Sequence, residues 1–566
     1  MKITSLLYLT SVGIFAGSLQ LPLARAADLT WNGGNSSWTD SGAWLLDGSS
    51  ADWINGSSAL FQTGSTLIVG SGISAAGLLY EGAAVTLNGG SLTLAGNASG
   101  SNGGSATLSG TALTLNSANQ EDRWTVRDTS LSGSSTLTKT GNGTVTLSGT
   151  HTANGTWNIN AGTLVFTGTR DITGGGQINI ASGAVLDASG GRLFHAANYA
   201  SNWEQPTITL NGGTLKLNQF GYNSASLGCL QNNFYALKFS SGTTSRVIIS
   251  QGYESGGTGS RGIYIAGWGT TAVIELGANQ TFTWSSSNGQ NFDSIVCESG
   301  AGSALQLDVG ENSVFNFDQK FANKNTANEY GAPTTSNFSG LSLIKSGSGE
   351  LVIKRANTIS SGRVVRVDAG KLTLDVDNAF GTGSGLGGVN IASGALLSMN
   401  GHTLNNTIEV VSGATLDMGG SSYASLVNWH EGGILLNTEN NKGTLNIMTR
   451  TELELGAKSW AGSVVTDTDT VFTLTTNQNL GALGAAVNCW IGGRGNNNTL
   501  QSISFTGGHD INIDNYGAKW AVILSENVTF QDTGDLTFSN NAADMTDTDA
   551  LYGAGAIAAN DTVTFS

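Results

Sequence analysis

Residues 162–166 read Gly-Thr-Leu-Val-Phe and carry a phrase that recurs along the chain. In each copy, one residue, in most copies a small one, follows a glycine, and a short alternation of apolar and polar side chains follows that residue. The copies begin at Gly90, Gly162, Gly183, Gly213, Gly370, Gly394 and Gly413. Glycine permits the positive φ of a tight corner, and alternation directs apolar side chains to one face of a strand. The phrase therefore predicts short strands joined by tight corners.

The spacing of the copies indicates how these strands are arranged. Gly162 is followed by Gly183 and then by Gly213, and later in the chain Gly394 is followed by Gly413. These intervals amount to roughly 20–30 residues, a period that is typical of a solenoid. One coil cannot bury its apolar face alone, but stacked coils can, each strand pairing in parallel with the next. We therefore expect an all-β, right-handed parallel β-helix.

The composition agrees with this expectation and excludes other classes. Glycine accounts for 81 of 566 residues, proline for 3, hydrophobic residues for 39% and charged residues for 11%. Such a chain is neither collagenous nor typically disordered, and no stretch has the composition of a long helix. The net charge of −16 makes nucleic acid an unsuitable partner, because acidic chains repel phosphate backbones.

Residues 1–26 predict export. Lys2 precedes an apolar run from residue 3 to about residue 19, and the triplet Ala24-Arg25-Ala26 follows. This pattern is typical of a secretory signal peptide. No later segment has about 18 consecutive apolar residues, so we expect no transmembrane helix.

The three cysteines are few and widely spaced. Cys229, Cys297 and Cys489 allow at most one disulfide, and buried free thiols are the favoured interpretation. Stability is therefore expected to come from stacked coils and not from a disulfide framework.

Two segments resemble the autotransporter-associated β-strand repeat. Residues 137–149 read LTKTGNGTVTLSG and are followed by NINAGTL at 158–164. Residues 343–353 read LIKSGSGELVI and are followed by VDAGKL at 367–372. The interval from the lysine to the later glycine is nearly the same in the two segments, from Lys139 to Gly162 and from Lys345 to Gly370. The resemblance implies a passenger-type protein that folds as a parallel β-helix of pectin-lyase-like architecture.

The C-terminal segment is similar to another passenger repeat. Phe538-Ser539-Asn540-Asn541 and residues 553–557 (GAGAI) resemble the F-x-x-N and G-G-A-[ILV] repeats of polymorphic outer membrane proteins. Both resemblances imply a C-terminal outer-membrane barrel. The last hundred residues do not supply the series of alternating segments that a barrel needs. We therefore expect either a fragment of a longer passenger or a different means of anchoring or release.

These observations divide the chain into four expected sections. They are a signal peptide at 1–26, an N-terminal cap rich in tryptophan at 27–80, a β-helix at 81–535 with repeats at about 137–166 and 343–374, and a repeat at 536–566 that is cut short.

The sequence offers few candidates for catalysis. Asp375 and Asp377 are two residues apart on one predicted strand, a spacing compatible with paired carboxylates, with Asp368 and Lys371 nearby. The favoured interpretation is a solvated strand end. The G-x-G-x-x-G at 383–388 is followed by another strand pattern and not by the helix of a dinucleotide site. The acidic run at 544–549 is interpreted as a solvated loop. The five histidines and three cysteines show no zinc-ligand spacing.

We therefore expect no catalytic, cofactor or metal site. The leading hypothesis is a structural or adhesive passenger-type protein at the surface of a Gram-negative bacterium, or released from it. Its expected partners are host or matrix glycans or proteins. The alternatives are a carbohydrate-active enzyme, such as a polysaccharide lyase or glycoside hydrolase, and a glycan-binding module on the same scaffold.

Overall fold

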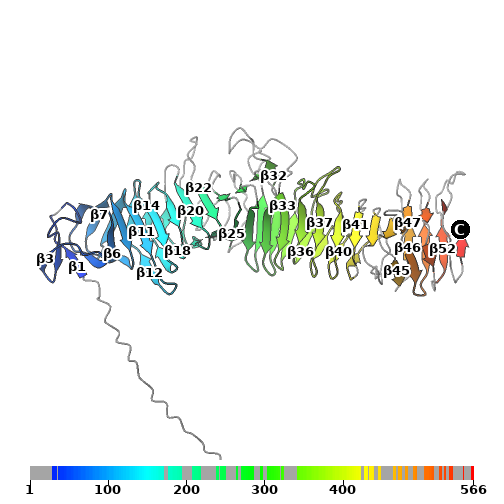
Figure 1. Cartoon of the computed structure of the whole chain (residues 1–566), viewed down its shortest axis with the longest axis horizontal. Helices are drawn as coiled ribbons and strands as arrows, with labels where there is room; N and C mark the ends of the chain where they lie inside the picture. The colour runs from blue at the N-terminus through cyan, green and yellow to red at the C-terminus, as the bar shows by residue number, and fades with distance from the viewer. Residues whose placement is uncertain are drawn as a thin grey trace, which may run out of the picture.

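A computed structural model of the chain shows an elongated stack of strands (Figure 1). The residues that it describes are 28–34, 36–170, 176–193, 207–217, 237–240, 242–249, 263–265, 269–285, 294–297, 302–318, 320–323, 341–421, 426–430, 432–438, 444–447, 463–466, 470–473, 478–481, 489–493, 503–514, 522–524, 528–530, 534–539, 552–553 and 563–565. Within these residues the regular structure is all strand, with no helix. The all-β prediction is thus confirmed.

Most strands belong to two long parallel stacks and one shorter stack, in which each strand pairs with the equivalent strand of the next coil. The first stack contains β8 (Ser91–Leu94), β11 (Ala112–Asn116), β14 (Thr136–Thr140), β17 (Trp157–Ile159), β20 (Gln177–Ala181), β22 (Thr207–Asn211), β24 (Leu237–Phe239), β26 (Ile263–Ile265), β29 (Ser294–Cys297) and β32 (Lys320–Asn323). The second stack contains β9 (Ala98–Ser101), β12 (Arg123–Val126), β15 (Thr144–Leu147), β18 (Thr163–Phe166), β21 (Val185–Asp187), β23 (Thr214–Leu217), β25 (Thr244–Ile249), β27 (Thr271–Leu276), β30 (Ser303–Val309), β33 (Leu341–Ser346), β35 (Val364–Val367), β37 (Gly388–Ile391), β39 (Ile408–Val410), β41 (Leu426–Trp429), β43 (Thr444–Ile447), β44 (Ser463–Thr466), β47 (Cys489–Gly493), β50 (Val522–Leu524) and β53 (Tyr552–Gly553). The third stack contains β28 (Thr281–Ser285), β31 (Val314–Asp318), β34 (Glu350–Ile353), β36 (Lys371–Leu374), β38 (Leu396–Ser398), β40 (Thr415–Asp417) and β42 (Ile434–Leu436).

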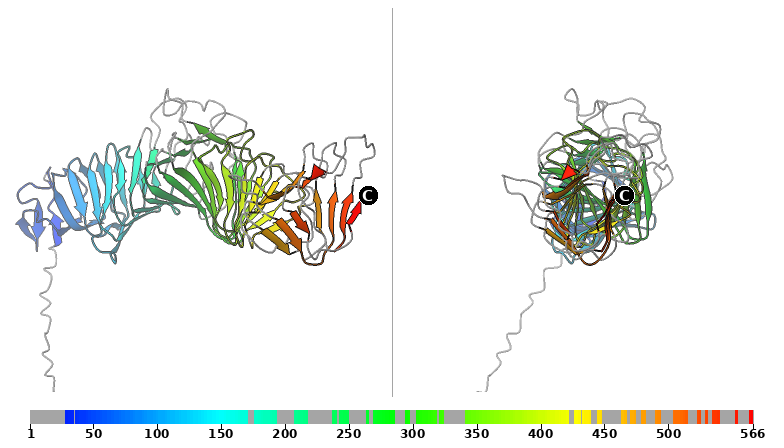
Figure 2. Two further views of the ribbon diagram at one scale, coloured as in Figure 1. Left: turned by 45° about the vertical axis from the view of Figure 1, so that its right-hand side comes forward. Right: turned by 90° about the vertical axis from the view of Figure 1, so that its right-hand side faces the viewer.

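Smaller groups of strands complete the two ends of the stack. Near the N-terminus lie β1 (Asp28–Trp31), β2 (Trp44–Leu46), β3 (Ser49–Ala51), β4 (Ser57–Phe61), β5 (Ser65–Ile68), β6 (Ile73–Glu81), β7 (Ala84–Asn88), β10 (Ser105–Ser109), β13 (Thr129–Ser132), β16 (Thr150–His151) and β19 (Thr169–Arg170). Near the C-terminus lie β45 (Thr470–Thr473), β46 (Gln478–Gly481), β48 (Ile503–Thr506), β49 (Ile511–Asp514), β51 (Val528–Phe530), β52 (Leu536–Ser539) and β54 (Val563–Phe565). In the end-on view the strands surround one central axis (Figure 2). The molecule is therefore a right-handed parallel β-helix, as predicted.

The pairing register gives the length of each coil. In the second stack, Val145 pairs with Leu164, whereas Leu307 pairs with Lys345, an interval about twice as long. Past Lys345 the coils shorten again, because Ile391 pairs with Val410. Coils in the middle of the chain thus exceed the predicted period, but the stack continues through them without a break.

Alternation decides which side chains fill the interior. In β18 the side chains of Leu164 and Phe166 are buried, whereas Thr163 and Val165 are partly exposed. The same pattern places leucine, isoleucine and valine of successive coils above one another in a single continuous core. The glycine-led phrase therefore forms strands for the reason that the sequence suggested.

Tryptophans fill the N-terminal end of the stack. β2 pairs antiparallel with both β1 and β3, in contrast to the parallel coils that follow. The indole of Trp44 packs against Trp31 and Trp38, with ring centroids 5.2 and 4.9 Å apart. Its Nε1 donates a hydrogen bond to the Trp38 carbonyl at 2.8 Å. This packing covers the apolar interior that an uncapped first coil would expose.

The register also bears on the cysteines. Cys297 ends β29, which is directly followed by β30, and Cys489 begins β47. Eight coil steps separate β30 from β47 in the second stack. At about 4.8 Å per step, Cys297 and Cys489 are roughly 40 Å apart, far beyond the reach of a disulfide. Cys229 and the predicted signal peptide lie outside the described residues, and none of the described segments forms a helix suited to crossing a membrane.

Candidate functional site

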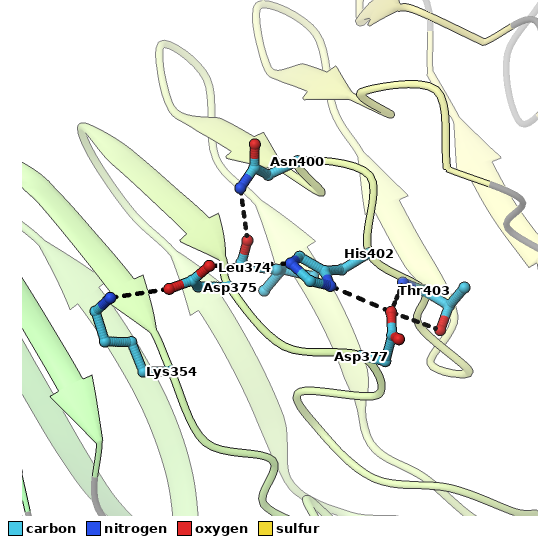
Figure 3. Close-up of polar contacts among 7 residues, drawn as sticks. All are labelled: Lys354, Leu374, Asp375, Asp377, Asn400, His402 and Thr403. Atoms are coloured by element: carbon cyan, nitrogen blue, oxygen red, sulfur yellow. Dashed lines mark hydrogen bonds and ion pairs between the residues drawn. The ribbon is translucent and has the colours of Figure 1, made fainter.

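A row of ionisable side chains lies where strands of the third stack end. Lys354 directly follows β34, and Asp375 directly follows β36. Ile353 pairs with Leu374, so the residues after them occupy equivalent positions in consecutive coils. His402 lies on the turn after β38 and is directed toward Asp375 and Asp377 (Figure 3). We call Lys354, Asp375, Asp377 and His402 the corner row.

Contacts in the corner row alternate between cationic or imidazole groups and carboxylates. Lys354 Nζ lies 2.8 Å from Asp375 Oδ2. The His402 ring lies between the two aspartates, with Nε2 4.0 Å from Asp375 Oδ1 and Nδ1 3.2 Å from Asp377 Oδ1. The Thr403 backbone N–H donates to Asp377 Oδ1 at 3.0 Å. These bonds from Thr403 and then from His402 lower the pKa of Asp377, so it is ionised at neutral pH.

Asparagine corners set the position of this row. Asn378 and Asn400 have φ values of 53° and 50°, in the left-handed region that asparagine tolerates better than most residues. The Asn400 side-chain amide donates to the Leu374 carbonyl at 3.3 Å, which ties this corner to the preceding coil. Two residues later, His402 can therefore reach back to the carboxylates of that coil (Figure 3).

The two predicted carboxylates lie close to one histidine at an exposed strand end. Asp375 and Asp377 lie beyond the end of β36, and both contact His402. Their side chains are 44% and 64% exposed. Solvent screens such groups. Lys354 and His402 contact Asp375, and His402 and Thr403 contact Oδ1 of Asp377. Whether the pair is a solvated strand end or has a catalytic role stays a prediction.

The other two acid–base candidates do not join this row. Asp368 lies before β36, at the opposite end from Asp375, and its carboxylate pairs with Arg366 at 2.6 Å. Lys371 begins β36, and its Nζ lies 3.0 Å from Glu350 Oε1 on the preceding coil. The structure therefore divides the four predicted candidates among three separate groups.

Two other sequence motifs, the glycine pattern and the acidic run, are not part of the corner row. The glycine pattern at 383–388 leads directly into β37, as the strand pattern predicted, and no helix N-terminus is present there to receive a phosphate. The acidic run at 544–549 lies outside the described residues. Among the described residues, no group of three or more His, Cys, Asp or Glu side chains is arranged to hold a metal ion.

Sequence reasoning missed the partners of the aspartates. His402 looked isolated, although it follows Asp375 by about one coil of the solenoid, and Lys354 precedes Asp375 by about one coil. The repeat period indicated that these residues lie on neighbouring coils, but the unequal intervals between them did not show which side chains meet.

Comparison with known proteins finds one relationship. No curated protein and no solved structure matches the chain. Residues 137–166, which form β14 to β18, match the family described as the passenger-associated-transport-repeat. The match confirms the resemblance to a passenger repeat that was inferred for residues 137–166. The resemblances inferred for residues 343–374 and for the C-terminal segment stay predictions. The matched repeat relates this chain to exported, passenger-type autotransporter proteins of Gram-negative bacteria.

Proposed function

We propose that the chain is an exported passenger-type protein that displays a rigid β-helix at the cell surface and adheres through its outer faces to host or matrix ligands. The observation that carries this proposal is the passenger repeat at 137–166, embedded in a continuous parallel β-helix. A stack of short coils gives a long, stiff structure whose outer faces present polar side chains at regular intervals.

Contacts between coils support a structural role for the surface side chains. On the third stack, Arg355 Nε lies 2.7 Å from Asp318 Oδ1, and the pairs Lys354–Asp375 and Lys371–Glu350 also join neighbouring coils. Ion pairs in contact with solvent typically contribute no more than about 1 kcal/mol each. In these pairs the charges are engaged along the stack, which suits a durable display surface better than a catalytic groove.

The test of display uses intact cells that express the full chain. Protease added outside should cleave the chain, while a periplasmic marker protein stays intact, and permeabilised cells should lose both proteins. Fractionation should recover the chain with the outer membrane or in the medium. A chain that resists external protease and is found only in the periplasm would contradict the proposal.

Adhesion is tested separately with the purified chain. Binding is measured on glycan arrays and on wells coated with matrix proteins, with a denatured sample as control. The proposal expects saturable binding without any product. Cleavage of a polysaccharide that is lost in Asp375→Ala would favour the carbohydrate-active alternative, and absence of all saturable binding would leave the chain as a structural element and refute adhesion.

A further inference from the structure

Two lysines lie inside the β-helix, where the alternation otherwise places apolar side chains. Lys139 on β14 and Lys345 on β33 are both fully buried. In register, Lys139 pairs with Leu115 of the preceding coil and Ile159 of the next. Both lysines occur at the same position of the two segments that share the Lys-x-Gly-x-Gly pattern.

Each ammonium group is held by three backbone carbonyls. Lys139 Nζ donates to the carbonyls of Thr140, Gly141 and Ala161 at 2.8, 2.8 and 3.1 Å. Two of these carbonyls belong to the corner that directly follows the lysine, and the third belongs to the next coil. The ammonium group therefore bridges two stacked corners.

The second lysine repeats this geometry. Lys345 Nζ donates to the carbonyls of Ser346, Gly347 and Ala369 at 2.7, 2.6 and 3.0 Å. In both units the first two carbonyls belong to the two residues after the lysine, and the third belongs to the alanine before the later glycine. Three carbonyl dipoles directed at one buried cation satisfy the three donors of an ammonium group.

The glycines of the unit allow the two corners to stack closely. Gly162 has φ +62°, and a Cβ on it would lie 2.5 Å from the Gly141 carbonyl oxygen and 2.4 Å from that of Gly143. Gly370 has φ +65°, and a Cβ on it would lie 2.5 Å from the carbonyl oxygens of both Gly347 and Gly349 in the corner of the preceding coil. Only glycine fits at these positions, and the close stacking brings the next coil's alanine carbonyl within reach of the lysine.

The two units occupy different places around the solenoid. Lys139 lies in the first stack, whereas Lys345 lies in the second, between Leu307 and Val367. The second stack, which contains Lys345 in β33, runs back through β18 to β15. In the first unit, β15 is the strand that follows the glycine corner, whereas the lysine is on the strand before that corner. The shared geometry therefore belongs to the unit itself and not to one edge of the β-helix.

We propose that a lysine lock, the buried ammonium group that joins the carbonyls of two stacked corners, is the element that fixes the register of one coil on the next in this repeat. Residues 343–374 form a second complete unit with the same lock. The two units join stacked corners at different positions around the β-helix. This inference is independent of where the protein is displayed and of what it binds.

The first test uses the natural chain, so it does not depend on a variant that folds. Purified protein is treated with an amine-acetylating reagent at about pH 7.5, and the modification rate of each lysine is measured by peptide mass spectrometry. Burial lowers the pKa of both Lys139 and Lys345 to about 8, so an unlocked amine would be unusually reactive. The lysine lock predicts the reverse, with rates roughly a hundredfold below those of the exposed Lys216 and Lys371. Rates equal to or above those of the exposed lysines would overturn the proposal.

The second test locates the effect of each lock. Lys139→Met and Lys345→Met keep most of the length of the side chain and remove its charge and donors, and Lys216→Met on the surface is the matched control. Amide exchange is followed at Thr163, whose N–H donates to the Gly143 carbonyl, and at Lys371, whose N–H donates to the Gly349 carbonyl.

The expected result is a crossed pattern. Lys139→Met should speed exchange at Thr163 roughly tenfold to a hundredfold and leave Lys371 unchanged, and Lys345→Met should do the opposite. Lys216→Met should change neither amide. Unchanged exchange in both core variants, or an equal rise at both amides in either one, would show that the lysines do not set local register.

Discussion

His151 provides a sensitive test of how this β-helix tolerates a polar group in its interior. The side chain is fully buried, and its Nδ1 accepts a hydrogen bond from the Leu131 backbone N–H at 3.2 Å. Because Nδ1 is an acceptor, the neutral ring carries its proton on Nε2. The rings of Trp157 and Phe166 lie 5.8 and 5.7 Å away, and Arg170 is its register partner on β19.

Burial is the main reason that the pKa of His151 falls from 6.5 to about 4, and the nearby charge of Arg170 lowers it further. The folded pKa lies below the unfolded one, so the unfolded chain binds the proton first as the pH falls. Stability associated with this residue is therefore complete above pH 6.5 and is lost progressively toward pH 4. One pKa unit corresponds to about 1.36 kcal/mol, so acidification from about pH 7.5 to about pH 4 should remove about 3 kcal/mol.

The measurement is local, because stacked coils need not unfold as one unit. The protection factor of the Leu131 amide, corrected for the intrinsic exchange rate, is compared at these two pH values. It should fall roughly a hundredfold in the natural chain on acidification. His151→Phe should show a lower but pH-independent value, because the titrating group is gone. The exposed control His402→Gln should behave like the natural chain. Equal pH dependence in the natural chain and in His151→Phe would refute the argument.

Three further predictions, one of them with a matched control substitution, test the packing of the coils and the corner row. Gly162→Ala should destabilise its coil by more than about 3 kcal/mol in hydrogen exchange because the new Cβ would lie within 2.5 Å of two carbonyl oxygens, whereas Gly183→Ala, with a similarly positive φ but open space, should cost only about 1–2 kcal/mol. Trp44→Ala should cost about 3–5 kcal/mol and lower protection chiefly in the N-terminal coils. Asp375→Asn should cost less than about 1 kcal/mol, and the effect should shrink in high salt because its ion pair with Lys354 is exposed.

The strands could be predicted because their determinants are local. Thr163–Phe166 and Lys371–Leu374 each follow a glycine with positive φ. In the first strand Leu164 and Phe166 alternate with partly exposed residues, and in the second Leu372 and Leu374 are buried, with Thr373 buried between them. A tight corner and the alternation that follows it are both visible within one short phrase of sequence. The stacking followed from the same pattern, since no single coil can bury its own apolar face.

The corner row could not be assembled from the sequence in the same way. The interval from Lys354 to Asp375 is shorter than the interval from Asp375 to His402, so no fixed period aligns all three. Coil length depends on how many residues each corner takes, and the corners vary more than the strands do. The side chains that meet across coils are thus set by loop lengths, which the alternation does not encode.

The buried lysines show where the alternation and the usual preference of lysine for the surface lead to different predictions. Leu137 and Lys139 are two residues apart, so the strand period places both on the inner side, as it does Leu343 and Lys345. Lysine is almost never fully buried unless its charge is compensated, and the general expectation is therefore a surface position. Here the adjacent glycine corners supply carbonyls without side chains to block them, which makes the inner position tolerable. The lysine and its glycines therefore form one physical unit, and this explains why they occur together in both segments, on different edges of the same solenoid.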